Sequence, residues 1–410
     1  MVSDGDVEPP LRVPPARVPI TGYVCCHWNL GCEYKGALRA QILNQTHQSS
    51  DDHPVSWPEN RVEYRHGKFS LFDCQYNSML NVEQGAMTFG YKDQDAVRVS
   101  DTKDIDAILD VFLSHGHRER KQLDTARYYG GGTSEKALGD IDWKAKGIVM
   151  QTKLYPVHFP QYFHIVGPHT ADGVRKYLDM SLESLKTDSI DMFYLHGPDR
   201  QVPYEETLKA VDDLYKEGKF KRFGISNYMS WEVAEIVGIC KANGYIQPTV
   251  YQGIYNAIHR AVEPELFPCL RKLGITFYGF NPLAGGFFTG RYTSMESASE
   301  PGSRFDPKGI QGQNYRKRYW NEQHFAALSK LQPVIEKHQL TMAEVALRWI
   351  SHHSMMKREF GDSVLIGASS LAHIEQNLLD LEKGPLPEEV VQALDEAWLS
   401  LKGVAAPYYH

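Results

Sequence analysis

Short apolar segments and amphipathic helical segments alternate eight times along this chain, beginning at about residue 81. Ile105, Ile108, Leu109 and Phe112, with helical i, i+3, i+4, i+7 spacing, follow the first apolar segment. The connections are too long for hairpins, so the strands are expected to be parallel, and eight such units predict a closed (β/α)₈ TIM barrel of class α/β. The predicted strands are 85–90, 123–124, 148–153, 190–195, 220–225, 249–252, 275–280 and 363–366.

A doubly wound open sheet is the alternative fold for such an alternation. That fold, when it binds a dinucleotide, usually opens its first helix on a Gly-x-Gly-x-x-Gly turn. No such turn follows the first strand here, and the glycines Gly130, Gly131 and Gly132 lack that spacing. The barrel is therefore favoured.

Composition excludes several classes of protein. The net charge of −7, from 44 basic and 51 acidic residues, argues against a sequence-independent nucleic-acid binder. No run of 18 apolar residues is present, so we expect no membrane span and no membrane partner. The N-terminus is acidic and rich in proline, unlike a secretory signal, and the six cysteines suit free thiols in a reducing cytoplasm.

The first 80 residues differ from the rest. Their start is rich in proline, and 45–66 is polar without a steady period, so we expect a disordered or loosely attached N-terminal extension at 1–80 before a barrel domain at 81–410. Cys25, Cys26, His27 and Cys32 lack the usual spacing of zinc ligands, and free thiols are the favoured interpretation.

The segment 81–84, Asn-Val-Glu-Gln, is polar where the first strand of a barrel is expected to be apolar on both faces. We therefore hypothesise that the residues upstream of about Asn81 derive from a wrongly assigned gene start or a retained intron. Mapping the N-terminus of the mature protein by mass spectrometry tests this, and abundant peptides from 1–80 would contradict it.

Polar residues stand at the ends of the predicted strands. Asp124 ends the second, Lys153 the third and His196 follows the fourth, with Tyr129 close behind Asp124. Taken singly, an aspartate here suits a helix N-cap, a lysine the solvated surface and a histidine a turn. In a barrel these strand ends meet at one mouth, so the four together predict an active site.

The chemistry of these four groups is that of proton transfer to a carbonyl oxygen. A free tyrosine has a pKa of about 10, and the ammonium of Lys153, held by Asp124, is expected to make Tyr129 a better acid. His196 can donate a hydrogen bond to an oxygen that gains negative charge. No side chain supplies hydride, so a cofactor is required.

At these positions the chain resembles the aldo-keto reductases, with Asp124, Tyr129, Lys153 and His196 matching their catalytic tetrad. The strings at 194–199, 224–228, 248–253 and 281–286 resemble the branch called aflatoxin aldehyde reductases, which also reduce succinic semialdehyde. The resemblance extends from about Gly85 to the C-terminus.

The resemblance implies NADPH bound without a Rossmann fold. Asp124, Ser226, Asn227 and Gln252 would surround the nicotinamide, and Phe280 would stack on it. Arg304, with Ser369, Ser370, His373 and Asn377 after the last strand, would contact the cofactor phosphates. The pyrophosphate loop would comprise Asn281, Pro282, Leu283, Ala284, Gly285, Gly286, Gly290 and Arg291. An ordinary surface loop is the alternative interpretation of that glycine-rich segment.

Tyr315 and Arg318, together with His196, resemble the substrate-binding residues of the branch. An arginine fork suits a carboxylate, although 316–318 could equally be a solvated basic run. Two residues depart from the branch: His373 replaces a glutamine, and the chain ends in His410 instead of arginine. A histidine is the weaker cation near neutral pH.

These observations predict NADPH-dependent reduction of small-molecule aldehydes, which include dialdehydes, succinic semialdehyde and aromatic aldehydes. Hydride would come from the nicotinamide and the proton from Tyr129. The branch implies a homodimer. The alternative is a non-catalytic NADP(H)-binding regulatory subunit that resembles channel-associated β-subunits, some of which keep the tetrad.

Overall fold

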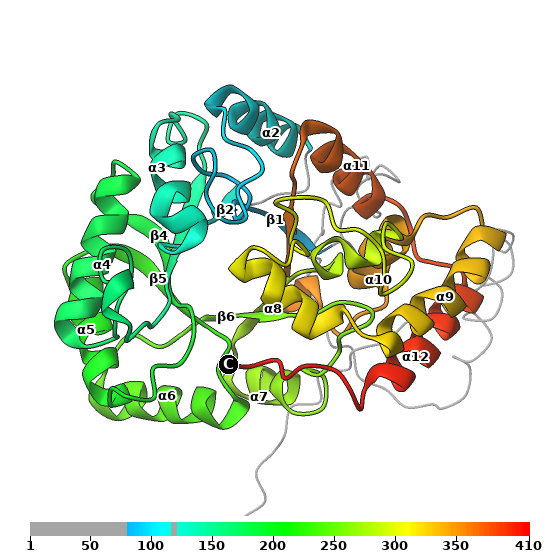
Figure 1. The fold of residues 1–410 in the computed structure, drawn as a ribbon. Helices are drawn as coiled ribbons and strands as arrows, with labels where there is room; N and C mark the ends of the chain where they lie inside the picture. The colour runs from blue at the N-terminus through cyan, green and yellow to red at the C-terminus, as the bar shows by residue number, and fades with distance from the viewer. Residues whose placement is uncertain (1–79, 116–120) are drawn as a thin grey trace, which may run out of the picture. The chain divides into compact units, whose positions relative to one another are not determined.

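A computed structural model describes residues 80–115 and 121–410 of the chain. Eight parallel strands form a closed barrel in chain order, as the sequence predicts (Figure 1). The strands are β1 Asn81–Gly85, β2 Gln122–Asp124, β3 Val149–Leu154, β4 Ile190–Leu195, β5 Phe220–Ser226, β6 Val250–Ile254, β7 Thr276–Phe280 and β8 Ser363–Gly367. The expectations for 1–79, including those for the cysteines and the gene start, lie outside the described residues.

The described residues also form helices, most of which alternate with the strands along the chain. They are α2 Thr102–Ser114, α3 Thr133–Gly139, α4 Ala171–Ser184, α5 Tyr204–Lys216, α6 Ser230–Asn243, α7 Leu266–Leu273, α8 Ile310–Tyr319, α9 Glu322–Lys337, α10 Met342–His352, α11 Leu371–Leu381 and α12 Glu388–Leu401. Short 3₁₀ turns lie at η1 Tyr129–Gly132, η2 Pro160–Tyr162, η3 Ala284–Thr289 and η4 Arg358–Phe360. Within the described ranges, no helix combines the length and the apolar character needed to cross a membrane.

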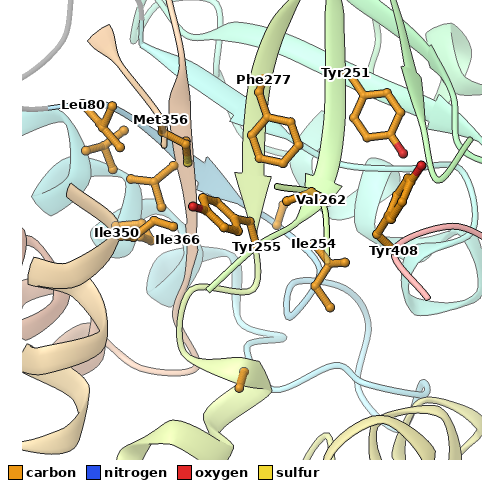
Figure 2. Close-up of a cluster of buried hydrophobic side chains, with 14 of the residues drawn as sticks. Leu80, Tyr251, Ile254, Tyr255, Val262, Phe277, Ile350, Met356, Ile366 and Tyr408 are labelled. Carbon is orange, nitrogen blue, oxygen red and sulfur yellow. The ribbon is translucent and has the colours of Figure 1, made fainter. Parts of the chain in front are cut away.

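Helices α4, α5, α7 and α11 pack on strands in a hydrophobic core outside the barrel, whereas α12 packs on α9 and α8 on the η3 turn. Figure 2 shows part of this core, where Tyr251, Phe277 and Tyr255 lie among aliphatic side chains. Tyr251 and Phe277 are stacked with ring centroids 6.1 Å apart, and Tyr255 meets Phe277 edge to face at 6.0 Å. This packing of β6 and β7 fixes the strands whose ends carry Gln252 and Phe280.

The prediction for the first strand is wrong. The strand is Asn81–Gly85, paired along its whole length with β8, whereas 86–90 turns away toward the barrel mouth. The reason is that one face of β1 does not need to be apolar. Val82 packs in the helix-facing core, while Glu83 is fully buried and bonds Gln151 of β3, a strand that is not its neighbour in the sheet.

The barrel interior is polar beneath the site. Gln151 accepts a hydrogen bond from the Tyr194 hydroxyl (2.8 Å) and donates one to Gln122 (2.7 Å). Gln122 also accepts from Arg222 (3.0 Å), which is paired with Asp191. A small apolar cluster completes the interior, formed by Met192, Tyr194, Val250, Tyr278 and Leu365. Bonded polar groups in a packed interior hold the strand ends above them rigidly.

Candidate active site

A cavity of about 1010 Å³ opens at the carboxyl ends of the strands. It is large enough for a dinucleotide and a small substrate together. The C-terminal tail, red in Figure 1, leaves α12 and runs back toward the strands. There the amide of His410 donates to the Asn227 carbonyl at 3.1 Å, so the chain end forms part of the wall.

Asp124 and Lys153 form a buried ion pair at the floor of this cavity. The Lys153 ammonium donates to both Asp124 carboxylate oxygens, at 2.7 and 2.6 Å, and to the Thr125 carbonyl at 2.8 Å. All three ammonium hydrogens are thereby used. Burial lowers the pKa of Lys153 below its ordinary value, although Asp124 acts in the opposite direction.

Tyr129 stands directly over this pair. The Lys153 ammonium lies 5.0 Å from the centroid of the tyrosine ring. Burial, followed by the Asp124 charge, raises the pKa of Tyr129 well above its ordinary value, while Arg304 acts to lower it. The expected effect of the Lys153 ammonium on the acidity of Tyr129 stays a prediction, since burial has the largest effect on the pKa of the resting phenol. The phenol accordingly keeps its proton at neutral pH.

His196 faces the same space. Its ring meets Tyr129 and Tyr155 edge to face, with centroids 5.7 Å away in both cases. Burial, reinforced by Lys153, holds the pKa of His196 well below its ordinary value, so the imidazole is neutral. A neutral imidazole has one N–H donor to offer an oxygen in the cavity.

The residues expected around a nicotinamide meet at the ends of β5 to β7. Asn227 donates its two amide hydrogens to the His196 carbonyl (2.8 Å) and the Ser226 hydroxyl (3.0 Å), which leaves its amide oxygen as an acceptor. Gln252 donates to Asp124 at 2.8 Å. Phe280 also lines the cavity. A carboxamide needs such acceptors, and a flat ring needs such an apolar face.

The glycine-rich segment after β7 follows a left-handed backbone. Gly285, Gly286 and Gly290 have φ of 69°, 96° and 76°. A Cβ on Gly285 would come within 2.3 Å of the Tyr315 ring, whereas nothing lies within 4 Å of one on Gly286. The loop thus exposes bare backbone to the cavity, as an anionic pyrophosphate requires.

A cationic corner lies where α11 begins. Ser370 caps this helix by accepting from the His373 amide (3.3 Å), and Ser369 bonds the His373 ring (3.0 Å). Arg98 and Arg291 line the same cavity as Ser369 and His373. Burial lowers the pKa of His373, and the two arginines act in the same direction. A helix N-terminus beside arginines attracts a phosphate.

The predicted substrate pair is present, but it is partly engaged within the protein. The Tyr315 hydroxyl accepts from Arg304 (2.9 Å), and the Arg318 guanidinium lies 5.7 Å from the Tyr315 ring. The ring of the terminal His410 also lines the cavity and forms a hydrogen bond with the Tyr155 hydroxyl (3.2 Å). Burial, with Arg318 and Arg200 nearby, lowers the pKa of His410 to about 4, so its imidazole is uncharged at neutral pH.

Most of the predicted site residues line this one cavity. Lys153, Ser226, Ala284, Gly290 and Ser370 do not. Of these, Lys153, Ser226 and Ser370 form hydrogen bonds with the lining residues Asp124, Asn227 and His373, respectively. Sequence reasoning missed Arg98 and an aromatic wall of Tyr128, Tyr155, Phe159, Tyr162 and Tyr409. Tyr128 stands next to a predicted residue, and the others stand in loops where no motif distinguishes them.

A profile of the Aldo/keto reductase family matches residues 82–399. The chain belongs to this family. It is 50% identical over 306 residues to an aldo-keto reductase of Pseudocercospora fijiensis, covering 74% of this chain and all of that protein. It is 46% identical to the aldo-keto reductase pigE of Monascus ruber, over 76% and 92% of the two chains. It is 44% identical to the human aflatoxin B1 aldehyde reductase member 2, over 71% and 81%.

Family membership makes this chain an NADP-dependent oxidoreductase. The residues present fit that cofactor. The free amide oxygen of Asn227 would accept a hydrogen bond from its carboxamide, and the open backbone at Gly286 would admit its pyrophosphate. Arg98 and Arg291, which line the cavity, would attract its 2′-phosphate.

Proposed function

We propose that this aldo-keto reductase reduces aldehydes to alcohols with Tyr129 as the proton donor. The observation that carries the proposal is the buried Asp124–Lys153 pair beneath Tyr129, with the neutral His196 beside it in one cavity. Bound NADPH supplies the hydride. The chain's own residues bind the aldehyde, orient its carbonyl oxygen and donate the proton to that oxygen.

Each of the four residues has a separate role in this reaction. Tyr129 keeps its proton until the carbonyl oxygen gains negative charge, because burial disfavours the phenolate in the resting site. His196, neutral, donates a hydrogen bond to that same oxygen. Lys153 stabilises the developing phenolate through space, and Asp124 keeps the lysine charged and fixed.

The site suits small aldehydes that carry an apolar or aromatic body. The aromatic wall contacts that body, and Arg318 supplies a cation for a carboxylate, as in succinic semialdehyde or 2-carboxybenzaldehyde. The three relatives described above are all reductases by name, and this favours an enzyme over a non-catalytic NADP(H)-binding subunit.

Steady-state oxidation of NADPH with each of these two aldehydes tests the proposal. Tyr129→Phe should keep NADPH binding and lose on the order of a hundred-fold or more in kcat. Tyr215→Phe, at a 40% exposed tyrosine on α5, is the matched control and should behave as wild type. Near-normal reduction by Tyr129→Phe would refute the assigned acid, and cofactor binding without turnover would favour the regulatory subunit.

We also propose a domain boundary near Asn81, a cytoplasmic location and a homodimer. The start of the family match at residue 82 and the start of β1 support the boundary. The six cysteines, which suit free thiols in a reducing compartment, support the cytoplasmic location. The resemblance to the branch supports the homodimer. Cell fractionation and light scattering of the purified protein test them.

A further inference from the structure

Glu83 is a carboxyl group that the proposed chemistry does not use. It lies on β1, inside the barrel and below the cavity floor, and is fully buried. Its Oε2 accepts one long hydrogen bond from Gln151 (3.2 Å). Its Oε1 has no hydrogen-bond partner among the described residues, and the effect of the Ser363 hydroxyl of β8, which lowers the pKa of Glu83, is smaller than that of burial. A bare carboxylate oxygen in a packed interior is costly, so the arrangement favours the neutral acid.

The charges around Glu83 also favour the neutral form. Asp124 of β2 and Lys153 of β3 face Glu83, and their opposite charges are already paired with each other. From β5, Arg222 is the nearby cation, and it is already paired with Asp191 (2.5 Å). The other titratable groups that interact with it are the phenols Tyr194 of β4 and Tyr278 of β7. An ionised Glu83 would therefore be an extra negative charge without a counterion of its own.

Glu83 is connected to the site by two side chains. Gln151, which bonds Glu83, precedes Lys153 by two residues on β3, so both side chains point into the barrel. Gln151 also accepts from the Tyr194 hydroxyl (2.8 Å), and the Lys153 ammonium lies 5.9 Å from the Tyr194 ring. The Asp124–Lys153 ion pair thus lies above a layer of hydrogen-bonded side chains formed by Tyr194, Gln151 and Glu83.

We propose that Glu83 is a positioning residue of this reductase: its neutral carboxyl holds Gln151 and Tyr194 beneath Lys153, and loss of its proton weakens proton donation by Tyr129. An added negative charge in this layer opposes the phenolate that forms on Tyr129 during reduction, since both charges share the same paired lysine. The inference rests on the proposed role of Tyr129.

Burial raises the pKa of Glu83 to about 8. The folded chain therefore keeps a proton that the unfolded chain loses above about 4.5, and stability falls as pH rises from about 4.5 to about 8. Above about 8 both states are ionised, and the loss is complete. Glu83→Gln, nearly isosteric and always neutral, should remove this loss.

The experiment compares Glu83→Gln with wild type between pH 5 and pH 9. In wild type, kcat/KM should fall at least five-fold as Glu83 ionises near pH 8, and in Glu83→Gln this fall should move to higher pH. The melting temperature of the variant without added cofactor should exceed that of wild type by a margin that widens from pH 5 to pH 8. The protonated carboxyl band in the wild-type infrared spectrum should be missing from the variant.

Glu396→Gln, at an exposed position of α12, is the matched control and should change none of these readouts. Glu83→Leu is the second neutral variant and should share the stability gain at high pH if Glu83→Gln folds poorly. An unmoved pH profile with a melting difference independent of pH would overturn the inference. Failure of the Tyr129 assignment is separate, because it appears as activity retained by Tyr129→Phe.

Discussion

Lys153 donates two of its three ammonium hydrogens to the carboxylate of Asp124, at 2.7 and 2.6 Å, in a place where both side chains are almost wholly buried. A buried pair of this kind is costly to break, since removing one partner leaves the other charge without compensation. The pair therefore links the catalytic chemistry of the reductase to its folding.

Asp124→Asn should reduce both activity and stability. We expect a loss of about 3–5 kcal/mol in the free energy of unfolding, measured by urea denaturation at pH 7. We expect kcat to fall on the order of ten-fold or more, since a less firmly charged Lys153 stabilises the phenolate of Tyr129 less well. Asp213→Asn, in an exposed i,i+4 pair with Lys209, is the control and should leave both quantities nearly unchanged. Equal behaviour of the two variants would mean that the buried pair has no special role.

Gly285→Ala should weaken cofactor binding. The residue has φ of 69°, and an added Cβ would lie 2.3 Å from the Tyr315 ring, so the loop or the tyrosine has to move. We expect the Kd for NADPH, measured by fluorescence titration, to rise about ten-fold, which corresponds to about 1.4 kcal/mol. Gly384→Ala is the matched control, because nothing lies within 4 Å of a Cβ there and its φ is ordinary. An unchanged Kd in Gly285→Ala would place the pyrophosphate elsewhere.

Much of this architecture could be predicted from the sequence. Ile190–Leu195 is a strand with the predicted bounds because its apolar run is short and is flanked by turn residues. The proximity of Asp124, Tyr129, Lys153 and His196 could be predicted because the ends of parallel strands in a barrel converge.

The errors have physical reasons as well. The first strand was misplaced because the rule that parallel strands are apolar does not hold where the barrel interior is polar, as it is around Glu83. The helices α8, α9 and α12 lie in the segments 281–341 and 380–410, for which no helix is predicted from the sequence. The raised pKa of the resting Tyr129 could not be predicted from its neighbours in the sequence, because its largest cause is burial in the folded chain.

Arg98→Ala should reduce the preference for NADPH over NADH. Arg98 comes from the loop after β1 and pairs with Glu300 (2.7 Å), which also holds Arg291 (2.6 Å) beside the start of α11. A 2′-phosphate placed there would gain a charge-assisted bond to Arg98, and NADH has no such phosphate. We expect kcat/KM for NADPH to fall about ten-fold while that for NADH stays the same. Arg175→Ala, at a surface pair with Glu217, is the control, and a parallel fall with both cofactors would contradict this placement.

His410→Arg should improve the use of aldehydes that carry a carboxylate. In the wild type the His410 imidazole has a pKa of about 4, so it is uncharged between pH 5.5 and pH 8. Wild-type KM for succinic semialdehyde should therefore stay flat over that range instead of falling as the pH drops toward 5.5, as it would with an ordinary histidine. An arginine is charged throughout, and we expect it to lower KM for succinic semialdehyde about ten-fold at pH 7 through a charge-assisted bond.

The control substrate for His410→Arg is an uncharged aldehyde such as benzaldehyde, whose KM should change little between wild type and variant. His338→Arg, at an exposed pair with Glu389, controls for added surface charge. An equal gain for both aldehydes would indicate a change in the shape of the aromatic wall. A wild-type KM that falls steadily on acidification would show that His410 is protonated in the working enzyme, because only the charged imidazolium attracts the carboxylate.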